Sequence, residues 1–171
     1  GDGITSVEEL VDEKGLQISY TANQKDFEKI PGSPIGFWIS KKSLSCFSNY
    51  ELLGSLAPPS AGLQTGDNTR FLRFHFEINS NHIGNNEKFV RYNKAGGNRK
   101  WYGLNEYVIL WKNEGEELRN TGKAVFRNSD KYLKKCISWG LISTGQLNTR
   151  FYEDGFIFDN GAPSLIIEDN L

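Results

Sequence analysis

The stretch FLRFHFEI, Phe71–Ile78, has the clearest alternation of apolar and polar residues in the chain. Successive side chains of a strand point to opposite faces, so four apolar residues of this stretch would share one face. These residues are Leu72, Phe74, Phe76 and Ile78. Because other elements have to cover such a face, the stretch predicts a strand in a fold that is built on β-sheet.

Further candidate elements lie on both sides of this stretch, separated by Gly, Pro, Asn and Asp residues. Strands are expected at Gly15–Tyr20, Ile35–Ser40, Lys88–Tyr92, Glu106–Trp111, Gln146–Tyr152, Phe156–Phe158 and Ser164–Ile167. Short helices are expected at Thr5–Lys14, Lys41–Asn49, Asn113–Asn120 and Ser129–Cys136, and a long loop at Gly54–Asn68. Strands and helices do not alternate regularly, so the sequence predicts an α+β fold: a strand-dominated mixed sheet with a few short helices, in a single domain.

The composition is that of a globular domain. A protein of 171 residues with 37% hydrophobic and 24% charged residues can bury one sizeable core, which excludes a disordered or collagen-like chain. No apolar run approaches the roughly 18 residues of a membrane span, so no membrane partner is expected. Because the sequence has no Met and no signal peptide, we expect a cytoplasmic piece of a longer protein. Residues 1–14 are expected to be a boundary or linker segment, with at most a short helix, and residues 15–171 the domain.

The sequence offers little for catalysis or metal binding. Cys46 and Cys136 are far apart and lack the spacing of a zinc site, so two reduced thiols are expected, with a disulfide as the alternative. Motifs for phosphate-binding loops, serine hydrolases, zinc proteases and dinucleotide binding are missing from the sequence. The adjacent acids Glu153 and Asp154 lie in a polar segment that is typical of a solvated surface. We therefore expect no catalytic residue and no metal ligand in this protein.

Basic residues are concentrated in the middle of the sequence, although the net charge is only −1. Residues 70–135 contain 14 Lys or Arg against seven Asp or Glu. Within them, KFVRYNKAGGNRKWYG (Lys88–Gly103) has five basic residues, four aromatic residues and no acid. Such a stretch is typical of a surface that binds a polyanion. The alternative is a solvated basic loop whose aromatic side chains, including Trp101, belong to the core.

Several blocks of the sequence are distinctive in composition and order. They are IPGSPIGFW (Ile30–Trp38), GLQTGDNTRFLR (Gly62–Arg73), YNKAGGNRKWYG (Tyr92–Gly103), the expected strand Glu106–Trp111, ISWGLISTG (Ile137–Gly145) and GFIFDNG (Gly155–Gly161). Together they resemble the adenine-specific DNA methyltransferases of BREX and phage-growth-limitation systems, which are related to fused type II restriction–modification enzymes. The resemblance extends over roughly residues 20–166.

This resemblance implies a role that is not catalytic in itself. Enzymes of the family have a catalytic domain with a Gly-rich S-adenosylmethionine loop and an Asn-Pro-Pro-Tyr or Asn-Pro-Pro-Phe motif, and neither occurs here. The resemblance implies that this segment follows the catalytic domain and is a DNA target recognition domain. It implies double-stranded DNA and the catalytic domain of the same polypeptide as partners. It also implies that S-adenosylmethionine binds the parent enzyme's catalytic domain, with no cofactor in this fragment.

Residue chemistry then selects candidates for DNA contact. Lys, Arg and backbone amides contact phosphates, whereas Arg, Asn and Gln read the edges of bases. The candidates are Asn93, Lys94, Gly96, Gly97, Asn98, Arg99 and Lys100 in one loop, Asn68 and Arg70 at a turn, and Ser143. The alternative for the turn is that Asp67 only holds the loop and that Asn68 and Arg70 do not contact DNA. A second basic stretch, Arg119–Lys135, is either another DNA-binding surface or a solvated helix face. Two other functions stay open: completion of a methyltransferase or nuclease active site, and carbohydrate binding.

Overall fold

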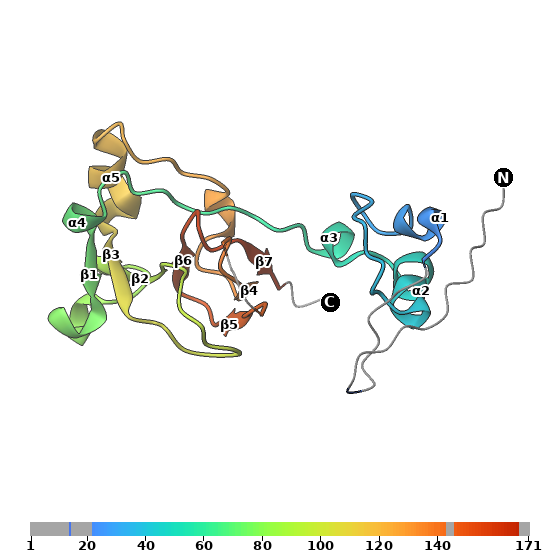
Figure 1. Cartoon of the computed structure of the whole chain (residues 1–171). Helices are drawn as coiled ribbons and strands as arrows, with labels where there is room; N and C mark the ends of the chain where they lie inside the picture. The colour runs from blue at the N-terminus through green and yellow to red at the C-terminus, as the bar shows by residue number, and fades with distance from the viewer. Residues whose placement is uncertain (1–13, 15–21, 143–145, 168–171) are drawn as a thin grey trace. The chain divides into compact units, whose positions relative to one another are not determined.

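The computed structural model describes residues 14, 22–142 and 146–167 (Figure 1). The protein divides into two compact units, residues 1–56 and 57–171, and each is described by itself. The strand expected at Gly15–Tyr20, and all but the last residue of the helix expected at Thr5–Lys14, lie outside the described residues. Among the described residues, no helix is long and apolar enough to cross a membrane.

The described part of the first unit is helical. It contains α1 (Gln24–Phe27), α2 (Lys41–Asn49) and α3 (Leu53–Leu56). The helix expected at Lys41–Asn49 is confirmed, and its N-terminal cap is Ser40, whose hydroxyl accepts the Ser43 N–H at 3.0 Å. The strand expected at Ile35–Ser40 is wrong, because a turn forms there in which the Ile39 N–H donates to the Gly36 carbonyl at 3.0 Å.

All described strands lie in the second unit, in two small sheets. The first sheet has the order β1-β3-β2-β6: β1 (Leu72–Phe74), β3 (Tyr107–Leu110), β2 (Phe89–Asn93) and β6 (Phe156–Phe158). Strand β2 runs antiparallel to β3 and parallel to β6, and β1 is antiparallel to β3. Buried side chains of these strands, including Tyr92, Ile109 and Ile157, form the main core together with Leu63 and Trp111.

The second sheet is antiparallel throughout, with the order β5-β4-β7: β5 (Arg150–Tyr152), β4 (Cys136–Ser138) and β7 (Ser164–Ile166). It packs on the first sheet through Cys136, Tyr152 and Phe156, with the Tyr152 and Phe156 ring centroids 5.1 Å apart. Both cysteines are free, Cys46 exposed and Cys136 buried. Burial raises the pKa of the Cys136 thiol to about 11.

The alternating stretch Phe71–Ile78 forms a strand only at Leu72–Phe74. The preceding residues form α4 (Asn68–Phe71), and the following ones form the 3-10 helix η1 (His75–Glu77). The Glu77 carboxylate accepts the Phe74 N–H at 2.8 Å, and this local bond closes the turn in place of a continued ladder. Phe76 is consequently 73% exposed, so the expected apolar face does not extend beyond β1.

The remaining expectations differ in accuracy. Strands at Lys88–Tyr92, Glu106–Trp111, Phe156–Phe158 and Ser164–Ile167 are confirmed to within a residue at either end, whereas only Arg150–Tyr152 of the strand expected at Gln146–Tyr152 forms. Helix α5 (Lys112–Asn120) lies where a helix was expected, although Asn113, Glu114 and Gly115 within it have positive φ. The helix expected at Ser129–Cys136 is wrong, because only η3 (Ser129–Lys131) forms and β4 begins at Cys136. Leu133, at φ 65°, lies outside the helical region. A further 3-10 helix, η2, spans Ser80–His82, and the α+β class is confirmed.

Candidate nucleic-acid interface

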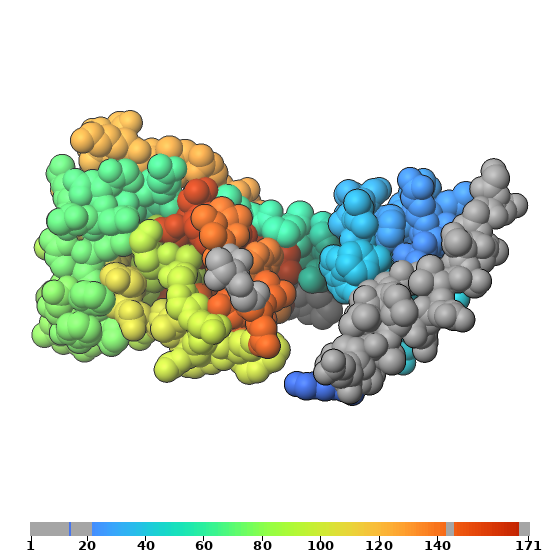
Figure 2. Space-filling view, viewed as in Figure 1, coloured from blue at the N-terminus to red at the C-terminus, as the bar shows by residue number. Residues whose placement is uncertain are grey.

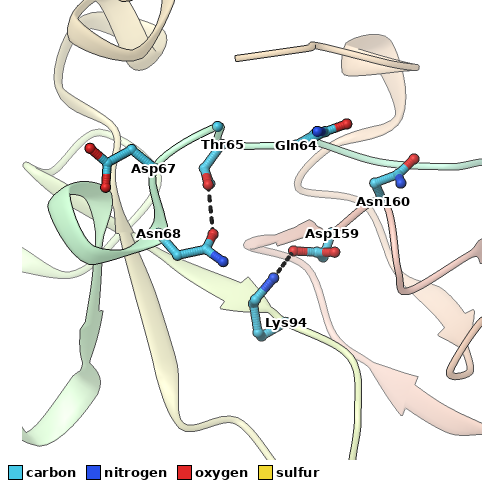
Figure 3. A pocket seen from close by; sticks show the side chains of 8 residues that line it. Gln64, Thr65, Asp67, Asn68, Lys94, Asp159 and Asn160 are labelled. Atoms are coloured by element: carbon cyan, nitrogen blue, oxygen red, sulfur yellow. Dashed lines mark hydrogen bonds and ion pairs between the residues drawn. The ribbon is translucent and has the colours of Figure 1, made fainter. Parts of the chain in front are cut away.

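A polar pocket of about 300 Å³ forms where three segments far apart in the sequence meet (Figure 3). Its lining residues are Gln64, Thr65, Gly66, Asp67, Asn68, Lys94, Asp159 and Asn160. Two of the residues selected from the sequence, Asn68 and Lys94, therefore lie in the same pocket. Arg70, selected with Asn68, does not line it.

Backbone hydrogen bonds bring these segments together. The Leu63 N–H donates to the Phe158 carbonyl, and the Asn160 N–H donates to the Leu63 carbonyl, both at 2.9 Å. The Asp159 N–H donates to the Asn93 carbonyl at 2.9 Å, which joins the end of β6 to the end of β2. A Cβ at Gly62 would lie 1.8 Å from the Phe158 carbonyl oxygen, so the close approach of the first segment requires glycine. The pocket is thus placed by the main sheet.

An ion pair lines the pocket, and a buried hydroxyl outside the lining bonds to its carboxylate. The Lys94 ammonium lies 2.6 Å from Asp159 Oδ2, with the two side chains 30% and 11% exposed. The Tyr92 hydroxyl lies 2.9 Å from the same oxygen and 3.1 Å from the Leu63 carbonyl oxygen. Burial, and then the Asp159 charge, raise the pKa of Tyr92 far above its usual value, so its hydroxyl stays protonated. The Gly161 N–H donates to Asp159 Oδ1 at 2.6 Å.

The turn before α4 orients the opposite wall of the pocket. The Asp67 carboxylate accepts the Arg70 N–H at 3.0 Å and caps the helix. The Thr65 hydroxyl donates to Asn68 Oδ1 at 2.6 Å, which turns the amide NH₂ of Asn68 toward Lys94 (Figure 3). The Arg70 guanidinium instead pairs with Glu117 Oε1 at 2.7 Å. Asp67 therefore holds the turn, and Asn68 is the residue of the turn whose amide points toward Lys94 across the pocket.

The pocket combines amide, ammonium and carboxylate groups within a small volume. Asn160 Oδ1 accepts a hydrogen bond from Arg127 Nη1 at 3.2 Å, and Gln64 contributes a third amide beside those of Asn68 and Asn160. Amides both donate and accept, and the ammonium only donates. Such a set matches the donor and acceptor groups of a nucleobase edge or a sugar–phosphate. Among the described residues, no group of His, Cys, Asp and Glu could hold a metal ion.

The loop that follows Lys94 begins with three residues in the left-handed region. Ala95, Gly96 and Gly97 have φ values of 70°, 85° and 68°. A Cβ at Gly97 would lie 2.3 Å from Leu104 Cδ1, whereas Gly96 has open space around it. The glycines therefore serve the bend itself, and Gly96 leaves its backbone accessible from outside.

Asn93 has a structural role at the start of this loop. It is 1% exposed; its Nδ2 donates to Ser138 Oγ at 2.8 Å, and its Oδ1 accepts the Ala95 N–H at 3.3 Å. Its amide connects β2 to β4 in the second sheet. Asn93 therefore does not reach the surface at which an adenine could be read.

The far side of the loop lies along the segment that leads into β5. The Trp101 N–H donates to the Thr149 carbonyl, and the Phe151 N–H donates to the Trp101 carbonyl, both at 2.9 Å. Figure 2 shows the yellow-green atoms of the loop against the orange atoms of this segment. Asn148 Nδ2 donates to the Gly97 carbonyl at 3.0 Å and lies 3.4 Å from Asn98 Oδ1. Lys100 Nζ donates to Gln146 Oε1 at 2.9 Å.

A buried arginine donates a hydrogen bond to the backbone of the loop. Arg150 is 1% exposed; its Nη1 donates to the Arg99 carbonyl at 3.3 Å and its Nε to the Tyr152 hydroxyl at 3.1 Å. No ion pair joins Arg150 to a carboxylate in the part of the protein that the structure describes. The cation is therefore satisfied by neutral acceptors, one of which belongs to the loop backbone.

The side chains of the loop are largely in solvent. Asn98, Arg99 and Lys100 are exposed, and Trp101 is 72% exposed. The alternative in which Trp101 belongs to the core is therefore wrong, because its backbone pairs with the β5 segment while its ring stays outside. Ser143 lies outside the described residues.

Four residues that support the pocket or the loop could not be identified from the sequence. Tyr92, Asp159, Asn148 and Arg150 all have contacts with partners far away in the sequence. The only signal for Asp159 is its position in the turn DNG directly after the apolar run FIF. Nothing in the sequence marks Arg150 as a buried side chain.

Comparison with known proteins identifies the family. The chain is 35% identical over 178 aligned residues to adenine-specific methyltransferase PglX of Lacticaseibacillus casei (strain Zhang), and the match covers 94% of the chain and 15% of that protein. It is 38% identical over 152 residues to adenine-specific methyltransferase BrxX of Escherichia coli O9:H4 (strain HS), with 86% of the chain and 12% of that protein covered. No family model matches the chain. The chain spans less than a sixth of the length of these relatives, and it belongs, as a segment, to the family of BREX-type adenine-specific methyltransferases.

Proposed function

We propose that this protein is the DNA target recognition domain of an adenine-specific (N6) DNA methyltransferase of a restriction–modification or phage-defence system. The observation that carries the proposal is the loop of residues 95–102. Its backbone is fixed at both ends, while the Arg99 and Lys100 side chains are exposed. The loop follows directly on Lys94, which lines the polar pocket together with Asn68. Fixed cations position a protein on phosphates, and Arg and amide groups read base edges.

The two parts of this interface have different tasks in the proposal. The loop, with Gly96, Gly97, Asn98, Arg99 and Lys100, approaches the phosphate backbone and one base edge. The pocket offers the Asn68 amide and the Lys94 ammonium, whose charge is already neutralised by Asp159. Lys94 therefore contributes hydrogen bonds more than net attraction, and of these two parts the loop contributes more to the salt-dependent affinity.

The parent enzyme supplies the chemistry. It transfers a methyl group from S-adenosylmethionine to adenine N6 after the base leaves the duplex, and the catalytic domain of the same polypeptide binds that cofactor. The present segment holds the duplex and selects the sequence. A part in completing an active site has no support from a metal-binding cluster in the described residues.

A salt titration of the 171-residue protein with duplex DNA tests the proposal. If about four phosphates are neutralised, the logarithm of the binding constant should fall with the logarithm of the salt concentration with a slope of about −3.6. A slope near zero, or no binding at low salt, would remove the electrostatic basis of the proposed DNA binding.

The same protein is also tested against a neutral glycan array. This tests carbohydrate binding, for which the exposed aromatic rings are the supporting feature. Calorimetry should detect no binding of S-adenosylmethionine to this segment.

A further inference from the structure

Trp101 and Tyr102 form an exposed aromatic pair at the end of the loop. Their exposed fractions are 72% and 62%. Moving a large aromatic surface out of water lowers the free energy. A pair of aromatic side chains held in solvent is therefore typical of a surface that binds a partner. Leu147, 65% exposed, lies in the neighbouring segment that leads into β5.

Trp101 is held rigidly although its side chain lies outside the core. Its φ is 72°, in the left-handed region that bulky residues rarely adopt. Its N–H and carbonyl are both bonded at 2.9 Å, to the Thr149 carbonyl and the Phe151 N–H. Strained positions of this kind persist only where the surrounding structure determines them, and they occur often at functional sites. The two bonds fix the backbone at Trp101, and with it the direction in which the side chain leaves the loop relative to β5.

The charges around the indole select the class of partner. Arg99 and Lys100 precede it directly, and residues 94–102 contain no acid. The Arg150 cation lies buried under the backbone of the same loop. An exposed indole amid cations matches a nucleic acid, in which a base offers a flat apolar face and the neighbouring phosphate a negative charge. An apolar protein partner would leave these cations without counter-charges.

We propose that Trp101 stacks on a base of the bound DNA, at a step where the duplex is unstacked or kinked. The proposal rests on the DNA-recognition function proposed above and goes beyond it, since it assigns a contact that is independent of base identity. Lys100, which precedes Trp101 in the sequence, holds the adjacent phosphate. The rigid backbone means that the ring enters the stack without a prior change in the loop.

The first test uses the intact methyltransferase that contains this segment. Affinity is measured by fluorescence anisotropy on a labelled pool of random-sequence duplexes for the wild type and for Trp101→Ala, Trp101→Phe and Trp38→Ala. Trp38 is a matched control, because it is also exposed, at 62%, but lies in the first unit. Loss of one stacked base should weaken binding by about 5-fold to 150-fold in Trp101→Ala. Trp101→Phe should recover much of the loss, and Trp38→Ala should bind as the wild type does.

The second test needs no variant, so it holds even if Trp101→Ala folds poorly. The wild-type enzyme is irradiated with a duplex pool in which 5-iodouracil replaces thymine, and the cross-linked peptide is sequenced. Cross-links at Trp101 are expected.

If the wild type binds no duplex, the proposed function fails. If it binds, but Trp101→Ala equals Trp38→Ala and no cross-link maps to Trp101, only the stacking proposal is overturned. A Trp101→Ala enzyme that binds DNA normally but loses attachment of this segment to the catalytic domain in limited proteolysis would identify a protein interface instead and would also overturn it.

Discussion

Lys94 of the pocket directly precedes the loop of residues 95–102 in the sequence, yet the pocket and the loop use basic residues in opposite ways. In the pocket, the Lys94 ammonium is neutralised by Asp159 at 2.6 Å, and the buried Tyr92 hydroxyl donates to the same carboxylate oxygen. In the loop, main-chain groups are bonded and the Arg99 and Lys100 side chains extend into solvent. A single basic stretch thus supplies one structural cation and two exposed ones. The number of charges in a segment says little about binding until their partners are known.

The largest effect on stability is expected from Asp159→Ala. The change leaves Lys94 and the Tyr92 hydroxyl without their shared acceptor, and breaking a buried pair costs about 3 to 5 kcal/mol. We expect the low end, because the Lys94 side chain is 30% exposed. Urea unfolding of the 171-residue protein measures the loss. The control is Glu117→Ala, which breaks the exposed Arg70–Glu117 pair and should cost less than about 1 kcal/mol. Equal losses would contradict a structural role for the pocket pair.

Tyr92→Phe should have a smaller effect with a distinctive pH dependence. It removes one buried hydroxyl beside the Leu63 carbonyl and Asp159, at a cost of about 1 to 3 kcal/mol. The folded state raises the pKa of Tyr92, so the native protein keeps a proton that the unfolded chain loses above about pH 10. The free energy of unfolding should therefore fall with rising pH in this range, and less steeply in Tyr92→Phe. Identical alkaline slopes in the two proteins would refute this interpretation.

For the loop, the largest expected effect is on recognition and not on stability. Arg99→Ala in the intact enzyme should cost about 1 to 3 kcal/mol of binding at the correct site and relax the preference at one position. Its unfolding free energy should change by no more than about 0.5 kcal/mol, because the side chain is exposed. Methylation of a site library checks the preference. If rate, preference and salt dependence stay as in the wild type, the contact must be sought at Arg70 or in residues 119–135.

Lys100→Ala should have the smallest effect of the four. An ammonium offers a point charge without the planar fork of Arg, so its loss should weaken binding to all sequences alike. The slope of the salt titration should flatten by about 0.9. The bond from Lys100 Nζ to Gln146 Oε1 lies at the exposed edge of the loop, and stability should hardly change. A change in sequence preference in this variant would mean that the tasks of Arg99 and Lys100 have been assigned the wrong way round.

Local patterns predicted where most of the short strands and one helix lie along the sequence. The short apolar runs at β2, β3, β6 and β7 are confirmed, as is α2 with its Ser40 cap. The most regular pattern, Phe71–Ile78, was confirmed only in part, because the Glu77 carboxylate accepts the Phe74 N–H and β1 ends after three residues. Alternation reports which residues would share a face, and it does not report whether a partner strand is present to pair with them.

The sequence predicted which residue types form the site, but not which side chains they contact. Lys94 and Asn68 were selected for their side chains, and they do meet in one pocket. What the sequence could not contain was the distance between Lys94 and Asp159, which are 65 positions apart, or the burial of Asn93 behind Ser138. Those contacts depend on the parallel pairing of β2 with β6 and on the packing of the two sheets. They are properties of the tertiary fold.

The main-chain bonds between Trp101 and the β5 segment have a consequence for how such proteins diversify. The bonds from the Trp101 N–H to Thr149 and from the Phe151 N–H to Trp101 involve no side-chain atom, so they place no demand on residue identity at the exposed loop positions. Under the proposed function, substitutions at Asn98, Arg99 and Lys100 would alter what is recognised while the scaffold is inherited unchanged. A family under pressure from changing targets would then accumulate variation in this loop and retain Asp159, Tyr92 and Gly62 beneath it.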